Sequence, residues 1–193
     1  TFSFGQEVLG LLLAGTIIVV LGLIDDFGVL SPVVKLFGQS IAIFVLIRSG
    51  IYIKLEFMPW YVSFPLSFLW LIGITNAFNL IDNMDGLCAG VGFIAAAFLA
   101  LLYFGNSPPL FLTSAVIAAS LLGFLIYNFN PASIFMGDSG SLSIGFSLSM
   151  LALYYSEAAK TNIISIYAIP TLILMVPIFD TTMVTLIRTL SGK

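Results

Sequence analysis

Residues 68–104 read "FLWLIGITNAFNLIDNMDGLCAGVGFIAAAFLALLYF". A polar stretch, residues 76–86, follows one apolar run in this segment and precedes another. The two runs belong to the apolar segments 64–81 and 87–104, whose lengths approach the ~20 residues that a membrane-spanning helix needs. The polar stretch carries Asp82 and Asp85, three residues apart. The pattern indicates two membrane helices joined at a polar turn. Because an acidic side chain is costly in hydrocarbon, it also raises the question of what these two acids do.

The composition of the whole chain supports the same interpretation. Of its 193 residues 60% are hydrophobic and 8% are charged, and the mean hydropathy is +1.17. A soluble domain has about 25% charged residues. Strands of a membrane barrel would alternate apolar and polar residues, whereas these apolar runs are continuous. We therefore expect an all-α polytopic membrane protein that forms a single integral-membrane domain over residues 1–193.

Seven apolar segments predict about seven transmembrane helices. Their approximate ranges are 8–24, 36–50, 64–81, 87–104, 110–127, 142–155 and 163–187. Between the second and third segments, "IYIKLEF" at residues 51–57 alternates apolar and polar side chains, which predicts a short strand or hairpin. In the last segment, Pro170 and Pro177 are expected to bend the helix.

If the seven segments alternate in direction, most of the aspartates meet on one side of the membrane. Those in the loops on that side are Asp25, Asp26, Asp82, Asp85 and Asp138. Asp180 lies toward the same side, and the three glutamates, Glu7, Glu56 and Glu157, fall on the other. Three Lys or Arg residues on each side give no positive-inside signal. The sequence thus predicts an acidic site on one membrane face without deciding which face it is.

The first polar motif is "GLIDDFG", which ends the first span with the adjacent acids Asp25 and Asp26. Like charges this close repel each other, which favours a nearby cation or a carboxylate with a raised pKa. The pair could serve a metal, a phosphate or proton transfer. The alternative is a solvated helix end, although acids there oppose the helix dipole.

The second motif places Asn79, Asp82 and Asp85 at three-residue steps. On a helix, residues at this spacing share a face, so the three could line one wall of a site. The alternative is a polar helix end capped by Gly86.

The third motif, "NPASIFMGDSGS" at residues 130–141, carries Asp138 between glycines and serines. The carboxylate could hold a metal while backbone N–H groups contact phosphate; the alternative is a flexible turn. The chain has no histidine, which excludes a Ser-His-Asp triad and the commonest zinc ligand. A metal held by oxygen atoms would be Mg²⁺ or Mn²⁺.

Three other side chains have both a functional and a structural interpretation. Lys35 could bind a phosphate oxygen or could extend its ammonium group from the membrane edge to water. Phe135 could stack on a base or could pack against the protein. Asp180 follows Pro177 in the last segment and could act directly or structurally.

Taken in order, the motifs "DDFG", "LSPVVKL", "NAFNLIDNMDG", "NFNPASIFMGDSGS" and "VPIFDTTMVTLIR" resemble those of the polyprenyl-phosphate N-acetylhexosamine-1-phosphate transferases. The resemblance covers nearly the whole chain. "NAFNLID" and "PIFDTT" look more like the branch that transfers GlcNAc-1-phosphate or a related sugar than the branch that transfers phospho-MurNAc-pentapeptide for peptidoglycan.

The resemblance implies Mg²⁺-dependent transfer of N-acetylhexosamine-1-phosphate from a UDP-sugar to undecaprenyl phosphate, with release of UMP. This would be the first membrane step of an envelope glycan such as teichoic acid or O-antigen, with the active site on the cytoplasmic face of the bacterial inner membrane. Among the residues, it implies Asp138 as the metal ligand and Asp25 and Asp26 as catalytic acids that position or deprotonate the lipid phosphate or assist the metal. The substrate-binding residues that it implies are Asn79, Asp82, Asp85, Lys35, Phe135 and Asn128.

The chain departs from the family pattern in two ways. Asn83 stands where the family usually has glycine in "DGLDG" or "DGIDG". We also expect the chain to be a piece of a longer protein, without the family's first spans and its His-rich C-terminal loop.

The partners implied are a UDP-N-acetylhexosamine, undecaprenyl phosphate and the bilayer, and a homodimer is one open oligomeric state. The net charge of −3 argues against nucleic acid. Two other classes of function are a cation-coupled transporter and a membrane scaffold. Transporters usually place their acids near the bilayer midplane, whereas five of these six aspartates fall at span ends.

Overall fold

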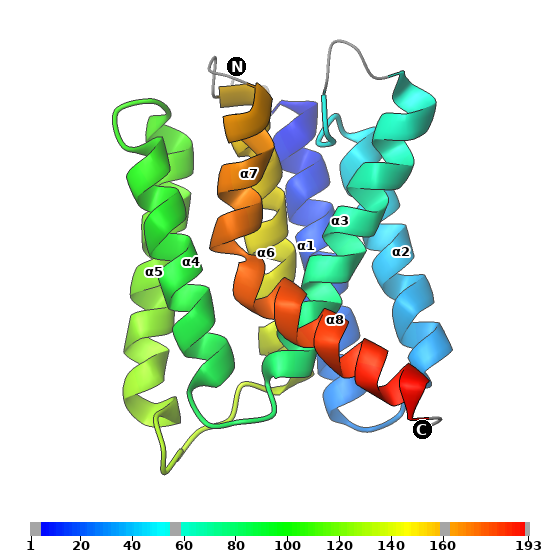
Figure 1. The fold of residues 1–193 in the computed structure, drawn as a ribbon, viewed down its shortest axis with the longest axis vertical. Coiled ribbons are helices and arrows are strands. Elements are labelled where there is room, and N and C mark those ends of the chain that lie inside the picture. The colour runs from blue at the N-terminus through cyan, green and yellow to red at the C-terminus, as the bar shows by residue number, and fades with distance from the viewer. Residues whose placement is uncertain (1–4, 55–58, 159–162, 192–193) are drawn as a thin grey trace.

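A computed structural model gives the structure of the chain and describes residues 5–54, 59–158 and 163–191. The described residues form helices joined by turns. These helices are α1 (Gln6–Asp26), α2 (Pro32–Arg48), α3 (Trp60–Ile81), α4 (Leu87–Tyr103), α5 (Pro108–Asn128), α6 (Gly137–Ala158), α7 (Ile163–Ile173) and α8 (Met175–Leu190). Figure 1 shows α1 to α7 side by side along the long axis of the molecule, with α8 crossing obliquely in front of α3.

Several of these helices have the length and composition of membrane spans. In the described part of the chain, α1, α3 and α5 are long and apolar enough to cross a bilayer, and α4 is a shorter apolar helix. Large apolar side chains such as Leu12, Phe44 and Ile126 are exposed on the outer helix faces, where lipid would cover them. The helical class of the prediction is therefore confirmed, and the chain is a membrane protein.

The predicted strand or hairpin at residues 51–57 is wrong. Residues 51–54 form no strand, and residues 55–57 lie outside the described part of the chain. The alternation does describe burial, because Ile51 and Ile53 are buried in the core. The Ile53 backbone N–H donates to Ser67 Oγ at 2.8 Å. A side chain of α3 thus provides the acceptor that a second strand would otherwise supply.

The last predicted segment, 163–187, is two helices instead of one. The chain breaks at Leu174 between α7 and α8. Pro177, in the first turn of α8, has no N–H to donate to the carbonyl of Ile173 four residues earlier. The bend expected at this proline is thus a helix break, and it lets α8 leave the direction of α7 and cross α3.

The core forms around α6, which packs against α1, α3, α4 and α7. Its buried side chains Leu142, Phe146 and Leu151 contact the apolar cluster that the neighbouring helices contribute. At the end that carries Asp138, α6 comes very close to α1. A Cβ atom on Gly22 of α1 would lie only 2.4 Å from the Cα atom of Ser139. The absence of a side chain at Gly22 therefore brings the end of the first span against the start of α6.

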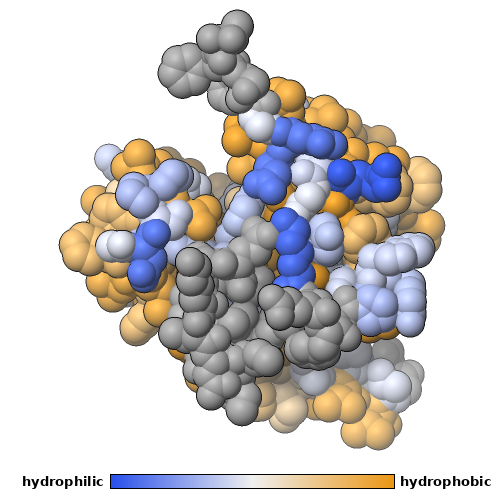
Figure 2. All heavy atoms as spheres, turned by 90° about the horizontal axis from the view of Figure 1, so that it is seen from above, coloured by the Kyte–Doolittle hydropathy of each residue, from blue (hydrophilic) through white to orange (hydrophobic). Residues whose placement is uncertain are grey.

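The helix directions place the three polar motifs together, as the parity of the segments predicts. The connections α1–α2, α3–α4 and α5–α6 all lie at the lower end of Figure 1, opposite the N-terminus. Figure 2 looks onto the N-terminal end, where hydrophilic side chains gather and hydrophobic side chains form much of the rim. Asp25, Asp82 and Asp138 are therefore at one end of the helix bundle, with Glu7 near the other.

Candidate functional site

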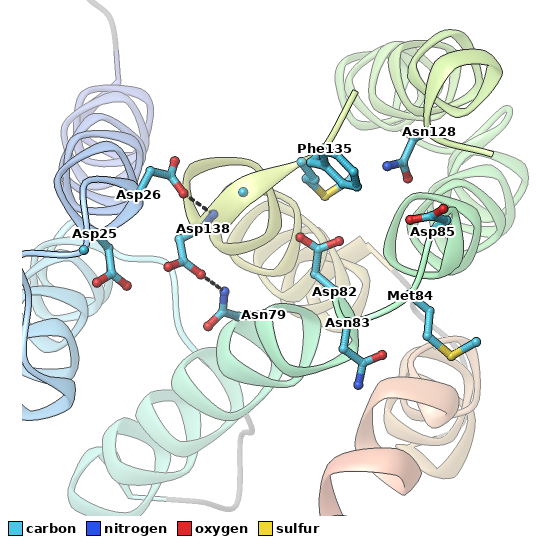
Figure 3. Close-up of a pocket in the computed structure, with 13 residues that line it drawn as sticks. Asp25, Asp26, Asn79, Asp82, Asn83, Met84, Asp85, Asn128, Phe135 and Asp138 are labelled. Atoms are coloured by element: carbon cyan, nitrogen blue, oxygen red, sulfur yellow. Dashed lines mark hydrogen bonds between the residues drawn. The ribbon is translucent and has the colours of Figure 1, made fainter. Parts of the chain in front are cut away.

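A polar cavity of about 440 Å³ opens at the end of the bundle where the three motifs meet. It is lined by the end of α1 with the following loop, the end of α3 with the following turn, the last residue of α5, and the segment that leads into the first residues of α6. The lining residues are Asp25, Asp26, Gly28, Asn79, Asp82, Asn83, Met84, Asp85, Asn128, Phe135, Met136, Gly137 and Asp138. Figure 3 shows that carboxylates from three separate parts of the chain face this space.

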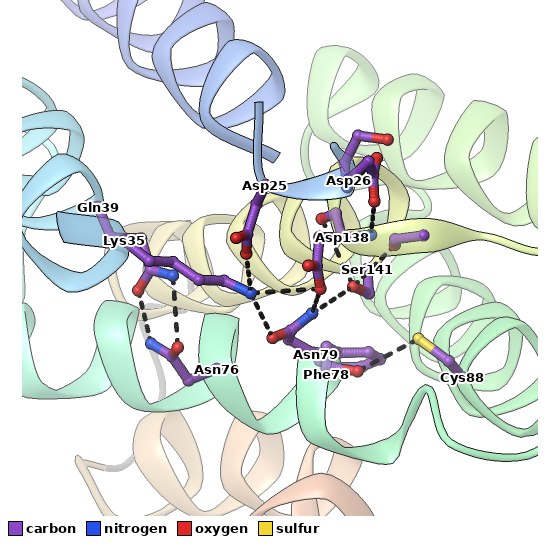
Figure 4. Close-up of polar contacts among 12 residues, drawn as sticks. Asp25, Asp26, Lys35, Gln39, Asn76, Phe78, Asn79, Cys88, Asp138 and Ser141 are labelled. Atoms are coloured by element: carbon purple, nitrogen blue, oxygen red, sulfur yellow. Dashed lines mark hydrogen bonds and ion pairs between the residues drawn. The ribbon is translucent and has the colours of Figure 1, made fainter. Parts of the chain in front are cut away.

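Lys35 provides the positive charge at one side of the cavity. Its Nζ lies 2.6 Å from Asp25 Oδ2 and 3.2 Å from Asp138 Oδ1. It also donates to Asn79 Oδ1 at 2.9 Å. The Nδ2 group of Asn79 in turn donates to Asp138 and to Ser141 Oγ. The four polar groups around Asp138 form one network that joins α1, α2, α3 and α6 (Figure 4).

Asp26 lies beside Asp25 in sequence but has different partners. Its Oδ1 accepts the backbone N–H of Asp138 at 2.6 Å, and its Oδ2 accepts the N–H of Ser139 at 3.2 Å. These N–H groups belong to the first turn of α6, where no helical carbonyl is available to them. The Asp26 carboxylate therefore caps α6 from another helix, with a favourable interaction with the helix dipole.

Gly137 permits this close contact. Its φ of +68° lies in the left-handed region, which residues with a side chain rarely adopt. A Cβ atom there would lie 2.7 Å from Asp26 Oδ1. The glycine before Asp138 is therefore required both by the backbone conformation and by the approach of Asp26.

Asp82 has no resolved salt-bridge partner in the described part of the chain, and its pKa is raised from 3.8 to about 6. Partial burial is the largest cause, followed by the negative charges of Asp138 and Asp26. Asp82 lies just beyond the last residue of α3, outside the membrane-spanning segment. Its raised pKa indicates that this part of the cavity has an excess of negative charge, which a cation would relieve.

Two other polar side chains connect the turn after α3 to the loop before α6. Asp85 Oδ2 accepts the backbone N–H of Ala132 at 3.0 Å and the Nδ2 group of Asn130 at 3.2 Å. Asn128 accepts the N–H of Gly86 at 3.1 Å and donates to the carbonyl of Ile134 at 2.9 Å. The two loops thus form one wall of the cavity.

Phe135 lies on this wall, on the side of the cavity away from Asp25 (Figure 3). Its side chain is 74% exposed and is not part of the apolar core. An exposed aromatic ring beside Asn128 and Asp85 offers a surface on which a planar base could stack, with hydrogen-bonding groups beside it.

The donor set is suitable for Mg²⁺, although the ligands are not preassembled. No group of three or more His, Cys, Asp or Glu side chains close enough to chelate a metal occurs among the described residues. Mg²⁺ needs fewer, because it usually binds one or two carboxylates together with waters and substrate phosphates. Asp138 and the destabilised carboxylate of Asp82 line the same cavity and match this requirement.

The structure brings together the residues that the sequence singles out. Eight of the nine predicted site residues line the cavity, and the ninth, Lys35, contacts three groups beside it. The helix-face argument for Asp82 and Asp85 is nevertheless wrong, because α3 ends at Ile81 and both acids lie in the following turn. Asp180 does not line the cavity.

Sequence reasoning missed two polar residues next to the site, Ser141 and Gln39. Ser141 lies three residues after Asp138 in the same motif, and its hydroxyl accepts a hydrogen bond from Asn79. Gln39 is fully buried in α2. A signal for it exists in the sequence, since a glutamine four residues after Lys35 shares a helix face with it.

The sequence of the chain is similar to those of several known proteins. Residues 8–156 match the family described as glycosyl transferase family 4. The chain is 41% identical over 188 residues to a probable undecaprenyl-phosphate N-acetylglucosaminyl 1-phosphate transferase of Bacillus subtilis, covering 92% of this chain and 51% of that protein. It is 30% identical to a decaprenyl-phosphate N-acetylglucosaminephosphotransferase of Mycobacterium tuberculosis, covering 100% of this chain and 54% of that protein.

A relative from the other branch matches as well. The chain is 34% identical to a phospho-N-acetylmuramoyl-pentapeptide-transferase of Halalkalibacterium halodurans, covering 92% of this chain and 61% of that protein. The chain spans about half the length of the first two relatives. With more than half of its residues matched and the motifs joined in one cavity, the chain belongs to glycosyl transferase family 4.

Proposed function

We propose that the full-length protein transfers N-acetylhexosamine-1-phosphate from a UDP-sugar to undecaprenyl phosphate, at the cytoplasmic face of the bacterial inner membrane and with Mg²⁺ as cofactor. An oxygen of the lipid phosphate attacks the sugar-bearing phosphorus, and the bond from that phosphorus to the bridging oxygen breaks. UMP leaves with the bridging oxygen, and a lipid-linked sugar diphosphate is formed. The observation that carries this proposal is the convergence of three acidic motifs on one cavity at the end of membrane helices.

Both substrates are anionic, so the charges of the cavity decide how they could bind. The ammonium group of Lys35 lies beside the cavity between Asp25 and Asp138, where its positive charge could contact a phosphate oxygen of the substrate. Mg²⁺, when bound at Asp138 and Asp82, would offset the charge of the diphosphate and of the departing UMP. In the proposal Asp25 orients the lipid phosphate, and Asp26 keeps Asp138 in place through the backbone of α6.

The opposite end of the cavity suits the nucleotide. Phe135 would stack on the uracil, and Asn128 and Asp85 lie beside it. Both polar side chains also bind loop backbone, so they would contribute to the shape of the base pocket as well as to its hydrogen bonds.

An apolar groove supports a place for part of the polyprenyl chain. The groove, of about 590 Å³, lies between α3 and α8. Leu69 and Gly73 of α3 and Ile178 of α8 are among its lining residues. Ala77, which also lines the groove, lies about one helical turn before Ile81, the last residue of α3, and the polar cavity opens at this end of the helix. A lipid in the groove could thus present its phosphate close to the acidic site.

The test is an assay of the full-length protein in liposomes with undecaprenyl phosphate, Mg²⁺ and a panel of UDP-sugars, with UMP release as the readout. UDP-N-acetylglucosamine is the expected donor. Release with UDP-MurNAc-pentapeptide instead would assign the chain to the peptidoglycan branch. Absence of release with every donor, from protein that is folded by size-exclusion chromatography, would refute the transferase proposal.

A further inference from the structure

A buried pair of amide side chains joins α2 to α3 just beside the polar cavity. Gln39 of α2 is fully buried, and its Nε2 donates to Asn76 Oδ1 at 3.3 Å. Asn76 Nδ2 donates back to Gln39 Oε1 at 2.6 Å and also to the carbonyl of Ile72. Figure 4 shows the two amides facing each other in a reciprocal contact, next to the Lys35 network.

The spacing along both helices relates this pair to the site. Gln39 follows Lys35 by four residues, and Asn76 precedes Asn79 by three, so each pair shares one helix face. The Gln39–Asn76 contact therefore lies about one helical turn from the Lys35–Asn79 contact. Within the described ranges, the side chains that form hydrogen bonds between α2 and α3 are Lys35 with Asn79 and Gln39 with Asn76.

The hydrogen bonds between the two amides can fix the axial position of α2 against α3. The remainder of α2 between Leu36 and Ile47 is almost entirely apolar, and apolar helix surfaces in lipid do not strongly specify one axial position. A shift of α2 along α3 would leave the buried amide of Gln39 without its partner and would remove from Asn76 its contact with α2. The same shift would withdraw Lys35 from Asp25 and Asp138.

We propose that Gln39 and Asn76 are positioning residues, whose reciprocal amide contact fixes α2 against α3 and thereby holds the Lys35 ammonium between Asp25 and Asp138. The kinetic part of this inference rests on the proposed transferase function. The placement of Lys35 does not, so the two can be tested separately.

The experiment uses three variants of the full-length protein in liposomes. Gln39→Asn shortens one partner by a methylene group and breaks the contact. Gln39→Asn combined with Asn76→Gln restores the combined length. Ser40→Ala is the matched control, because Ser40 is the next residue on α2 and its hydroxyl donates to Leu36 of its own helix.

Two readouts are taken on each variant. The first is the rate at which an amine-reactive reagent modifies Lys35, followed by peptide mass spectrometry. The second is kcat for UMP release at saturating donor. Gln39→Asn is expected to accelerate the labelling of Lys35 severalfold and to lower kcat by about tenfold, since a misplacement of roughly 1 Å can slow catalysis by up to ~100-fold.

The combined variant is expected to recover both values to within about threefold of the wild type. The second substitution lets the two amides form their hydrogen bonds again, and the effects of residues in direct contact are coupled. Ser40→Ala should match the wild type. Unchanged labelling of Lys35 in Gln39→Asn would overturn the positioning role, as would failure of the combined variant to recover. If labelling changes and recovers while no variant, the wild type included, releases UMP, the positioning role stands and the transferase proposal fails.

Discussion

The carboxylate of Asp26 accepts the backbone N–H of Asp138 at 2.6 Å, although 112 residues separate them in the sequence. This contact distinguishes two adjacent acids that look equivalent as "DD". Asp25 forms an ion pair with Lys35, whereas Asp26 caps the helix that carries Asp138. The pair therefore combines one group that faces the charges of the cavity with one that maintains its geometry.

Replacing Gly137 should disrupt this geometry. Gly137→Ala places a Cβ atom 2.7 Å from Asp26 Oδ1 at a φ of +68°. We expect a loss of about 1–3 kcal/mol in stability from the strained backbone and a fall in kcat of roughly tenfold or more from the displaced Asp138. Thermal unfolding and UMP release measure the two effects.

The control is Gly123→Ala in α5, where a Cβ atom would have nothing within 4 Å. This variant should retain the stability and rate of the wild type. A Gly137→Ala protein as stable and active as the control would contradict the role of the Asp26 contact.

Asp138→Asn should remove nearly all transferase activity. The amide has almost the shape of the carboxylate but no charge to hold a metal ion, and removing a single group that stabilises charge in a transition state costs about 100- to 1,000-fold. Glu7→Gln makes the same chemical change near the opposite end of the bundle and should leave the rate unchanged. Wild-type turnover by Asp138→Asn would eliminate this residue as the metal ligand.

The raised pKa of Asp82 predicts a pH-dependent effect on stability. Its pKa rises from 3.8 to about 6, so the folded protein disfavours the charged form, and the wild type loses stability as the pH rises through this window. In buffer without divalent cations, Asp82→Asn should unfold at a higher temperature than the wild type at pH 7.5. The difference should shrink as the pH falls below about 6.

Adding Mg²⁺ provides the complementary measurement. If Asp82 helps to hold the ion, Mg²⁺ should raise the unfolding temperature of the wild type at pH 7.5 more than that of Asp82→Asn. The Mg²⁺ effect on the wild type should weaken below about pH 6, where protons compete for the carboxylate. If Mg²⁺ raised the unfolding temperature of both proteins equally, Asp82 would not be a ligand of the ion.

Phe135→Ala tests the nucleotide end of the cavity. The ring is 74% exposed, so its removal should leave the unfolding temperature nearly unchanged. The KM for the UDP-sugar should rise about tenfold, because stacking of a base on an aromatic ring contributes roughly 1–3 kcal/mol, whereas the KM for undecaprenyl phosphate should not change. Phe129→Ala is the matched control, since Phe129 is 68% exposed and does not line the cavity.

Gly73→Leu tests the apolar groove. A Cβ atom at Gly73 would meet nothing within 4 Å, so a leucine can extend into the groove without disturbing the fold. The KM for undecaprenyl phosphate should rise by about tenfold through the lost lipid volume, with the KM for the UDP-sugar unaffected. Gly123→Leu places the same side chain in open space on α5 and should have no effect. An unchanged KM for undecaprenyl phosphate in Gly73→Leu would show that the polyprenyl chain does not bind in this groove.

The sequence by itself determined the helical class, the membrane setting and the gathering of the aspartates. These properties follow from the length of each apolar run and from the count of runs, which are local features of the chain. For the same reason the predicted helix ranges differ from the observed ones by only a few residues at most boundaries.

Tertiary structure alone decided which partner each polar group has. Asp26 with Asp138, Asp85 with Ala132 and Gln39 with Asn76 are contacts between residues 37 to 112 positions apart. No local pattern encodes such a distance, because it depends on how closely two helices approach. The wrong prediction of a strand at residues 51–57 has the same cause. The alternation predicted which side chains are buried, but the backbone N–H of Ile53 donates to the Ser67 side chain on α3 and not to a second strand.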